Sequence, residues 1–371
     1  MISQELLLDI TKCSRCGKCA ALCPMFEKSR GWDTGVARGR ILLAWGLARG
    51  ELEINDELIK ALYECPTCML CEQQCTAGVN VTKIIREARA LVVERGASVP
   101  FSHKAVFDTV ARITLRDGLN RNWLDLVKGD FRENGEIVYF PGCLPYVEPI
   151  LDLDLGAERI ISGAVKILNR AGIQPAIIKE LGCCGHDAFW SGEYPLFNAL
   201  REKNSKLLKG VKVIVTSCAE GYMTLKKGYF LEAEVYHISQ FVRDLIRDGR
   251  LNLKKGEERV TFHDPCRLGR HMGEYDAPRE VLSLIADYKE MARYGNNASC
   301  CGVGAWMNCN QYSKQIRLDR VKEASEVADT LITACTKCLA HFRCLITEPG
   351  KTEDLPEIKI VDFTEFVSSN L

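Results

Sequence analysis

The sequence lacks an excess of charge of either sign. Lysine plus arginine and aspartate plus glutamate both number 49, so the formal net charge is zero, and nothing indicates a basic groove for nucleic acid. It also lacks any run of about eighteen uncharged apolar residues, the length typical of a transmembrane helix. The most apolar stretch, residues 160–178, contains Lys166 and Arg170. These absences argue against a nucleic-acid-binding protein and against a membrane-spanning one.

The start of the chain lacks the features of a secretion signal. Glu5 and Asp9 are acidic, and the first cysteine follows at position 13. Nineteen cysteines without such a signal argue against a disulfide framework and favour metal ligation in a reducing compartment. We therefore expect a cytoplasmic protein that reaches the cytoplasmic face of a membrane only through a partner. Its length and its 47% apolar residues predict two or three compact domains.

Most of the cysteines fall into repeated patterns, and the first pattern occurs twice near the start as C-x2-C-x2-C-x3-C. This is the spacing of bacterial ferredoxins, in which three thiolates of one run and the fourth of the other run hold a cubane [4Fe–4S] cluster. Two structural zinc sites are the alternative, but zinc usually takes two cysteine pairs separated by a longer loop. We expect one cluster on Cys13, Cys16, Cys19 and Cys75, and another on Cys65, Cys68, Cys71 and Cys23.

The segments around these two runs have helical periodicity. Apolar positions predict helices over about 41–47 and 58–63 between the runs, and over 81–95 after the second run. Residues 1–95 are therefore expected to form a helical ferredoxin domain, and residues 96–136 a connector with one helix from about 102 to 115. Three apolar side chains beside the cysteines are expected to shield the clusters from water: Met25, Met69 and Leu70.

From residue 137 the sequence repeats itself. Each copy alternates short β-branched runs with helical segments, which predicts two small α/β domains with mostly parallel sheets, over 137–257 and 258–371. A cysteine pair precedes the next cysteine motif by the same 34 residues in both copies (184 to 218 and 301 to 335). We expect every cysteine motif to follow a strand, so that the thiols meet at the carboxyl edge of the sheet. The aligned segments are 137–143 with 260–266, 181–185 with 298–302, 213–221 with 331–338, and 235–242 with 360–367.

The order of these motifs resembles a known family. A C…CCG…CxxC pattern present twice behind a two-cluster ferredoxin module is similar to the catalytic iron–sulfur subunit of heterodisulfide reductase, which has CCG (cysteine-rich) domains. The segment from His263 to His271, with residues 276–279 after it, is similar to the signature of the second CCG domain. Iron–sulfur subunits of glycolate oxidase, anaerobic glycerol-3-phosphate dehydrogenase and a multisubunit benzoyl-CoA reductase share the layout. The resemblance covers essentially the whole chain and implies an α+β multidomain fold, a helical two-cluster ferredoxin domain followed by two repeated α/β CCG domains.

The two CCG motifs are not equal. In the resembling enzymes five cysteines hold a noncubane [4Fe–4S] cluster, and the second copy retains all five, so we expect the catalytic site there: Cys266, Cys300, Cys301, Cys335 and Cys338. In the first copy Gly221 occupies the place of the fifth cysteine. The four thiols that remain suit a zinc ion, a four-ligand cluster or a distorted noncubane cluster: Cys143, Cys183, Cys184 and Cys218.

Other polar residues near these motifs give weaker signals. His186 is either a donor over the first CCG site or an ordinary hydrogen-bonded histidine, and His237 and His263, at strand ends, favour capping or packing over proton donation. Cys309 and Cys344 match no ligand position and are expected to be small buried apolar residues. Three glycines are expected to let the backbone approach the sulfur atoms closely: Gly142, Gly185 and Gly302.

The chain has no flavin or nicotinamide fingerprint and no Ser-His-Asp constellation. Electrons are therefore expected from a flavoprotein or another redox subunit of a larger complex, with a membrane cytochrome b as a further partner. As an enzyme, the chain would be the disulfide-reducing subunit of a heterodisulfide-reductase-like complex. As a module without such chemistry, it would connect a flavin dehydrogenase or bifurcating unit to a quinone, a ferredoxin or a benzoyl-CoA-type reductase. We favour a heterodisulfide-reductase-like electron-transferring subunit, in which Gly221 argues against cleavage of a disulfide between two equal clusters.

Overall fold

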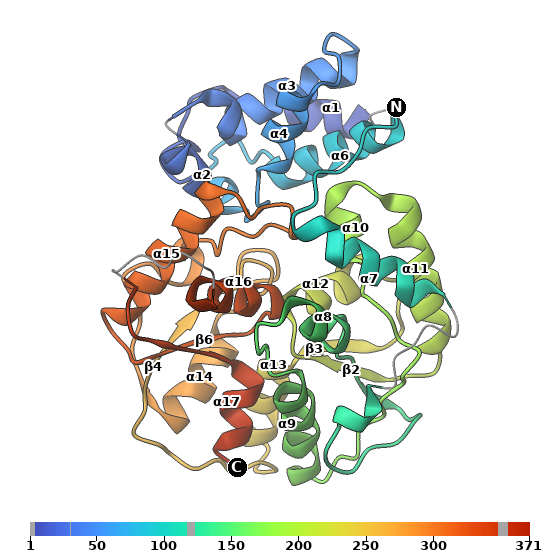
Figure 1. Cartoon of the computed structure of the whole chain (residues 1–371), viewed down its shortest axis with the longest axis vertical. Helices are drawn as coiled ribbons and strands as arrows, with labels where there is room; N and C mark the ends of the chain where they lie inside the picture. Colours follow the sequence, from blue (N-terminus) through green and yellow to red (C-terminus); the bar gives the residue numbers. More distant parts are fainter. Residues whose placement is uncertain (1–3, 30, 117–122, 348–354) are drawn as a thin grey trace.

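The computed structural model describes residues 4–29, 31–116, 123–347 and 355–371. A helical N-terminal part lies at the top of Figure 1, and two small parallel β-sheets with their helices lie below it. The mixed architecture predicted from the sequence, helices first and two α/β repeats after them, is confirmed.

The N-terminal part consists of helices only, among the residues described. The helices predicted over 41–47, 58–63 and 81–95 are confirmed, and local signals explain two of their ends. Gly50 ends one helix with a left-handed φ of 72°, and the side chain of Asn55 caps the next by accepting from the backbone N–H of Leu58 at 2.9 Å. The elements are α1 (Gln4–Thr11), α2 (Pro24–Lys28), η1 (Asp33–Gly35), α3 (Ala37–Arg49), α4 (Asp56–Tyr63), α5 (Leu70–Gln73) and α6 (Val81–Glu94).

The connector carries the helix that its sequence predicts. A 3-10 turn, η2 (His103–Ala105), leads into α7 (Val106–Leu115), and a second 3-10 turn, η3 (Leu124–Leu126), follows before the first sheet. The hydroxyl of Ser102 donates to the carbonyl oxygen of Trp306, in the second CCG repeat. The connector thus packs against the repeats and fixes the N-terminal part to them.

The two sheets have the same plan. In the first sheet the parallel order is β1 (Ile137–Tyr139), β2 (Val213–Thr216) and β3 (Glu234–His237). In the second the parallel order is β5 (Asp287–Tyr288), β4 (Arg259–His263), β6 (Thr330–Thr333) and β7 (Lys359–Asp362). The strands β1, β2 and β3 correspond to β4, β6 and β7 in the aligned sequences, so the internal repeat is a repeat of structure.

Helices of the two repeats pack against each other across the molecule. Helix α9 (Ala157–Arg170) contacts α17 (Phe363–Ser369), and α13 (Ile238–Arg247) contacts α14 (Asp276–Ile285), so the two repeats share one hydrophobic core. The helices are α8 (Leu144–Leu151), α9 (Ala157–Arg170), α10 (His186–Ser191), α11 (Tyr194–Leu207), α12 (Ala219–Gly228), α13 (Ile238–Arg247), α14 (Asp276–Ile285), η4 (Gly295–Asn297), α15 (Gln311–Ser325), α16 (Thr336–Thr347) and α17 (Phe363–Ser369). Other helices of the repeats contact the N-terminal part and the connector: α10 packs on α6 and α7, α11 on α7, and α15 on α2.

The expectation that every cysteine motif follows a strand is only partly right. Four single motifs do follow β1, β2, β4 and β6. The two adjacent pairs do not, because the chain leaves the sheet early in both repeats. Before the pair at 183–184 there is only an isolated bridge at Ala176, and before the pair at 300–301 strand β5 ends at Tyr288. Both pairs therefore lie on loops that return toward the carboxyl ends of the strands.

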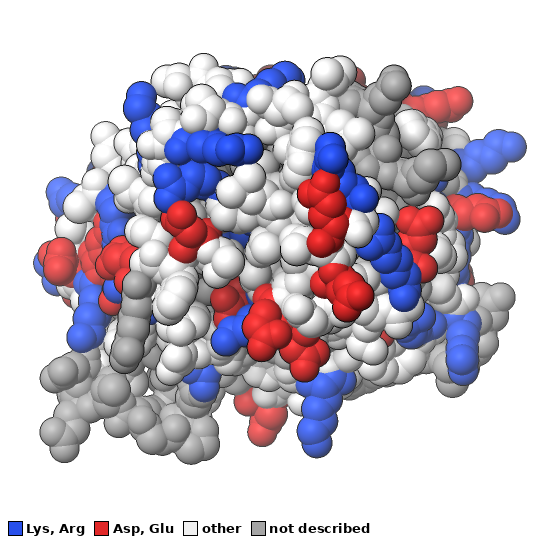
Figure 2. All heavy atoms as spheres, turned by 90° about the horizontal axis from the view of Figure 1, so that it is seen from above, with Lys and Arg blue, Asp and Glu red and all other residues white. Residues whose placement is uncertain are grey.

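The described surface is mixed in charge, and the described helices are not of the membrane-spanning kind. Figure 2 looks down on the face that carries the N-terminal helices, and on its described residues lysine and arginine are interspersed with aspartate and glutamate. This face accordingly has no large field of one sign. Of the helices that the structure describes, none combines the length and apolar character needed to cross a bilayer.

Candidate metal centres

The first group of ferredoxin cysteines lies at the surface. The four thiols predicted for the first cluster line one pocket at the N-terminal end of the chain, and Cys16 among them is exposed. Arg38 borders the same pocket, and its guanidinium forms an ion pair of 2.6 Å with Asp33. The structure thus brings together Cys13, Cys16, Cys19 and Cys75.

The second group of ferredoxin cysteines is more deeply placed. Cys23, from the first run, lies beside Cys65 and Cys68 of the second run, and Cys71 lies beside all three. Burial raises the pKa of the Cys23 thiol to about 11 and that of Cys71 well above its usual value. This is the grouping that crossed ligation of two cubanes requires.

The five cysteines of the second CCG site lie together in the interior. The sulfur atoms of Cys301 and Cys338 are 3.4 Å apart, Cys300 lies beside Cys266 and Cys301, and Cys335 lies beside Cys338. Four of the five are buried, and Cys266 is half-buried.

A histidine faces the second CCG site. A ring nitrogen of His263 and the sulfur atoms of Cys301 and Cys338 lie within 4.8 Å of one another. Its Nδ1 accepts a hydrogen bond from Nε of Arg320 at 3.2 Å, so the ring proton of the neutral form sits on Nε2. The expectation of a packing role holds in part, because the ring lies edge-on to Phe342 at 4.9 Å, but it also leaves a ring nitrogen next to the thiols.

The first CCG site adjoins the second. Cys184 lies beside Cys183, Cys143 and Cys218, which brings the four predicted thiols into one group. Cys218 also lies beside Cys335, a member of the second site. The two CCG sites therefore touch through one cysteine of each repeat.

The glycine of each CCG motif has a structural reason. The backbone N–H of Gly185 donates to the sulfur of Cys183 at 3.4 Å, and that of Gly302 donates to the sulfur of Cys300 at 3.3 Å. Both residues have a left-handed φ, of 80° and 96°, which favours glycine. A Cβ at Gly302 would also lie 2.9 Å from the carbonyl oxygen of Ser313. The predicted close approach of backbone to sulfur is confirmed at these two positions.

A buried polar cluster that the sequence did not reveal lies beside the first CCG site. The ammonium of Lys337, from the CxxC of the second repeat, forms ion pairs with Asp187 and, at 3.0 Å, with Glu220, both of the first repeat. Lys337 and Glu220 occupy equivalent positions in the repeat, two residues after Cys335 and Cys218. That opposite pair of charges inside two cysteine motifs was the signal that could have identified it.

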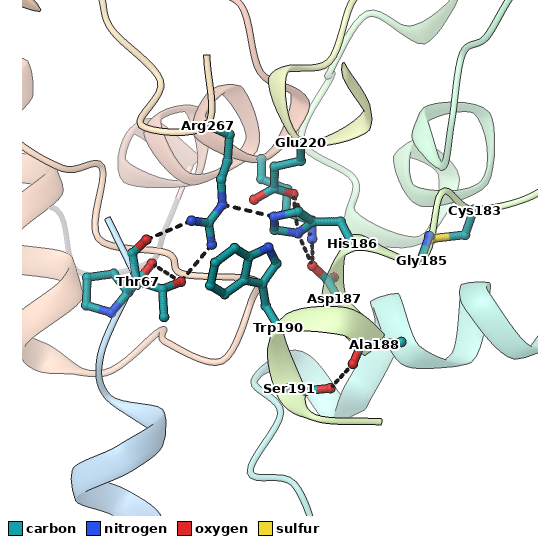
Figure 3. Close-up of polar contacts among 12 residues, drawn as sticks. Thr67, Cys183, Gly185, His186, Asp187, Ala188, Trp190, Ser191, Glu220 and Arg267 are labelled. Atoms are coloured by element: carbon teal, nitrogen blue, oxygen red, sulfur yellow. Dashed lines mark hydrogen bonds and ion pairs between the residues drawn. The ribbon is translucent and has the colours of Figure 1, made fainter. Parts of the chain in front are cut away.

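His186 lies inside this cluster, as Figure 3 shows, and its ring bonds to charged side chains of the cluster. Its Nδ1 is 3.0 Å from Asp187 and 3.2 Å from Glu220, and its Nε2 accepts from Arg267 at 3.0 Å. Burial lowers the pKa of His186 to about 3, so it is neutral with its proton on Nδ1. Burial alone would raise the pKa of Asp187, but Lys337 and His186 lower it to about 2, whereas burial raises the pKa of Glu220 well above its usual value. The charged pair is therefore Lys337 with Asp187.

Arg267 joins the three parts of the chain. It follows Cys266 of the second repeat and donates two hydrogen bonds of 2.7 Å to the carbonyl and hydroxyl oxygens of Thr67, in the second ferredoxin run. Its guanidinium also donates to His186 and lies 4.0 Å from the centre of the Trp190 ring, both in the first repeat. This one buried side chain fixes the ferredoxin run against both CCG repeats.

The donor set and the buried charges suit iron–sulfur clusters. All the candidate ligands are cysteines, the ligands of such clusters. Nη2 of Arg40 and of Arg270 are buried without a hydrogen-bond partner among the described residues, near Cys23 and Cys68. A buried cation is costly unless an anion is close, and thiolates bound to iron supply that negative charge.

The remaining polar residues and cysteines considered in the sequence are not members of the cysteine groups. His237 caps α13, because its Nδ1 accepts from the backbone N–H of Ser239 at 3.2 Å, as its expected capping role requires. Cys309 and Cys344 are half-buried rather than buried, so that part of the expectation is wrong. For Cys344 the reason is that α16 leaves the core after Phe342.

Two protein-family models match the chain, and together they cover most of it. The model described as "Cysteine-rich domain" (CCG) matches residues 137–226 and 260–343, and the one described as "4Fe-4S dicluster domain" matches residues 9–79. The chain contains two CCG cysteine-rich domains behind a 4Fe-4S dicluster domain. These two matches indicate iron–sulfur clusters in the N-terminal part and in the cysteine-rich repeats.

Relatives extend along nearly the whole CCG-domain protein. It is 29% identical to a component of the dihydromethanophenazine:CoB–CoM heterodisulfide reductase of Methanosarcina barkeri, over 98% of this chain and 95% of that one. It is 26% identical to a component of the fumarate reductase (CoM/CoB) of Methanothermobacter marburgensis, over 96% of this chain and 71% of that one. It is 29% identical to the probable iron-sulfur-binding oxidoreductase FadF of Bacillus subtilis, over 99% of this chain and 61% of that one. The CCG-domain protein is thus homologous to subunits of iron–sulfur oxidoreductases, and the predicted resemblance to heterodisulfide reductase is confirmed.

Proposed function

We propose that the chain is the electron-transferring iron–sulfur subunit of a multisubunit oxidoreductase similar to heterodisulfide reductase. In this proposal the two ferredoxin groups hold cubane [4Fe–4S] clusters and the second CCG site holds a noncubane [4Fe–4S] cluster. The first CCG site holds a second cluster or zinc. Bound clusters of this kind accept and release single electrons, and the residues of the chain set where those electrons enter and where they end.

The observation that carries the proposal is the unbroken series of cysteine contacts through the molecule. The exposed Cys16 belongs to the first ferredoxin group. Cys71 of the second ferredoxin group lines the pocket of that first group, and Cys68 of the second group lies beside Cys300 of the second CCG site. Cys335 of that site lies beside Cys218 of the first CCG site. The series begins at the surface and reaches the buried cysteines of both CCG sites, which gives electrons a route from the surface to either site.

The described residues also support a role for the second CCG site as the terminus of that path. It has the complete set of five thiols, with the backbone N–H of Gly302 and the ring of His263 directed to them. Reduction of a disulfide at this site would require one thiolate of the substrate to bind iron and the other to be protonated. His263 and the half-buried Cys266 are the residues placed to meet such a substrate.

A second function, electron transfer without disulfide chemistry, is favoured by one observation. Cys300, Cys301, Cys335 and Cys338 are between 2% and 4% exposed, and a site this closed suits a relay better than a site open to a bulky disulfide. Lys337, Asp187 and Glu220 also fill the space next to Cys143 of the first CCG site. In this case the chain would connect a flavin dehydrogenase or a bifurcating unit to a quinone, a ferredoxin or another reductase.

Partners follow from the exposed end of the series. Cys16 is exposed and its neighbours Arg15 and Lys18 carry positive charge, so a flavoprotein or another redox subunit would dock there, with a membrane cytochrome b as a further partner. We place the chain in the cytoplasm, attached to a membrane only through such a partner. The homologues named above support the existence of partners, since two of them are named as reductase subunits.

The proposal is tested by electron paramagnetic resonance (EPR) of the anaerobically purified chain and two serine variants. Cys338→Ser should abolish the signal of the second CCG site and any disulfide reduction with an artificial one-electron donor, while both cubane signals stay reducible. Cys344→Ser, a half-buried cysteine outside the site, is the matched control and should leave all signals unchanged. Loss of the signal without any disulfide-dependent turnover in the wild type would select the relay function. An unchanged spectrum in Cys338→Ser would refute the assignment of the cluster to this site.

A further inference from the structure

Four arginines are buried around the second ferredoxin run without a carboxylate partner. We call them the arginine shell: Arg40, Arg89, Arg267 and Arg270, which are 1%, 0%, 2% and 6% exposed. Among the residues that the structure describes, no carboxylate lies within ion-pair distance of any of the four. Each guanidinium instead donates to backbone carbonyl oxygens, as an uncharged donor would.

All four arginines bind the same short segment, residues 61–68. Arg40 donates to the carbonyl of Ala61 at 2.6 Å, and Arg89 donates to that of Cys65 at 2.6 Å. The other two come from the second CCG repeat: Arg267 donates to the carbonyl of Thr67 at 2.7 Å, and Arg270 to that of Cys68 at 2.6 Å. The shell thus encloses the loop that carries Cys65 and Cys68, from both sides of the boundary between two parts of the chain.

Arginines outside the shell show the usual alternative, a carboxylate partner. The buried Arg320 forms an ion pair with Glu323 at 2.9 Å, and the partly exposed Arg279 forms one with Asp264 at 2.7 Å. Removing a charge from water is costly unless an opposite charge is close. Four such charges around one loop are stable only if that loop itself carries negative charge, which the thiolates of Cys23, Cys65, Cys68 and Cys71 provide when they bind metal.

The first ferredoxin group has a different electrostatic environment. Among the basic residues that border its pocket, Arg15 and Lys18 are exposed, and Arg38 is 31% exposed and paired with Asp33 at 2.6 Å. Cys16 is exposed to water, which screens charges strongly. The two ferredoxin groups therefore have the same ligands but different surroundings: the charges beside the first are hydrated and screened, whereas those around the second are buried and positive.

We propose that the arginine shell makes the cluster on Cys65, Cys68, Cys71 and Cys23 the easier of the two ferredoxin clusters to reduce. The inference rests on the proposed function, which assigns a cubane to each group. Reduction adds one electron, and so one negative charge, without a proton. Buried fixed positive charges stabilise the charge-rich reduced form, and net charge and solvent exposure are known to set such potentials. Electrons that a flavoprotein partner delivers near Cys16 would then move downhill toward the second CCG repeat.

The test is an anaerobic redox titration of the full chain monitored by EPR. The wild type should show two cubane steps, and Cys16→Ser, which alters only the first group, should identify the step at lower potential. Arg89→Gln should lower the midpoint of the other step, so that its reduced-to-oxidised ratio at a fixed potential falls at least tenfold, equivalent to about 59 mV for a one-electron couple. Arg89→Lys keeps the charge and should retain most of the wild-type value.

The controls separate this inference from the proposed function. Arg38→Gln, at the hydrated group, should change either ratio less than twofold. If Arg89→Gln loses iron, Arg40→Gln carries the same test, because among the described residues the Arg40 guanidinium donates one hydrogen bond, to Ala61. Two results would overturn the inference and leave the proposed function intact. One is a pair of cubane potentials that do not change in the Arg89 or Arg40 variants. The other is a titration in which Cys16→Ser assigns the step at higher potential to the first group. A preparation with one cubane or none would refute the proposed function itself.

Discussion

Replacing Lys337 by methionine tests the polar cluster between the two CCG repeats. In the wild type the side chains of Lys337 and Asp187 are only 4% and 7% exposed, and Asp187 is ionised because Lys337 faces it. The ammonium also lies 4.7 Å above the ring of Phe107, in the connector. Methionine has similar length and fills the space, so the change removes the charge while keeping most of the packing.

The expected cost follows from the charge that remains. Breaking a buried ion pair by removing one partner costs about 3 to 5 kcal/mol, because it leaves an uncompensated buried charge. For a chain of this size that corresponds to a fall in melting temperature of roughly 4 to 6 °C. The double variant Lys337→Met with Asp187→Asn removes both charges, so it should recover at least half of the loss.

Thermal unfolding under anaerobic conditions, followed by circular dichroism, measures both effects. Lys206→Met is the control, since it breaks an exposed ion pair with Glu202 of 2.7 Å, whose side chains are 74% and 69% exposed. Exposed pairs contribute little to stability, so the control should change the melting temperature little. A loss below about 1 kcal/mol in Lys337→Met, or a double variant as unstable as the sum of the single ones, would refute this account of the cluster.

Two further predictions concern the first CCG site and the C-terminal helix. Gly221→Cys should add iron to the first site, because it supplies the missing fifth thiol and the site has room for it. A Cβ at Gly221 would lie 3.4 Å from the Thr216 hydroxyl and 3.7 Å from Cys218 Cβ, which are ordinary contact distances. Metal analysis beside the control Gly221→Ala measures the effect, and equal iron contents in the two variants would contradict the prediction. Asp362 caps α17 by accepting from the backbone N–H of Thr364 at 2.7 Å, and burial raises its pKa to about 7. The folded chain therefore keeps a proton that the unfolded chain releases, and this aspartate lowers stability increasingly as pH rises from about 4 to 7. The stability advantage of Asp362→Asn should grow by about 2 to 3 kcal/mol between about pH 5 and pH 8, and an advantage independent of pH would show that Asp362 is already ionised.

The sequence predicted those features that short-range patterns determine. The helices over 41–47, 58–63 and 81–95 follow from apolar periodicity within one element. The grouping of Cys23 with the second ferredoxin run was predicted from spacing alone, and the structure places it beside Cys65 and Cys68. The repeat was visible because both copies keep the same distances between cysteine motifs.

The features that the sequence did not reveal depend on contacts between distant segments. Arg267 donates to Thr67, two hundred positions away, and Lys337 pairs with Asp187 across the two repeats. The first contact leaves no local pattern, because a buried arginine looks like a surface residue until its partner is known, and the second leaves only the opposite charges of Glu220 and Lys337 at equivalent positions. The loops that carry the cysteine pairs were misplaced for a related reason: Ala176 makes only an isolated bridge, and such an edge is too short to give a strand pattern.

The proposed electron transfer depends on clusters held by these cysteines. The most direct measurement is the iron and acid-labile sulfide content of the anaerobically purified full chain, combined with its EPR spectrum before and after reduction. If these cysteines hold the clusters, each chain should contain at least about eight irons in the two ferredoxin groups and about four more in the second CCG site. The sulfide content should match, and the cubane signals should be reducible. A colourless protein that contains zinc and no sulfide would contradict it.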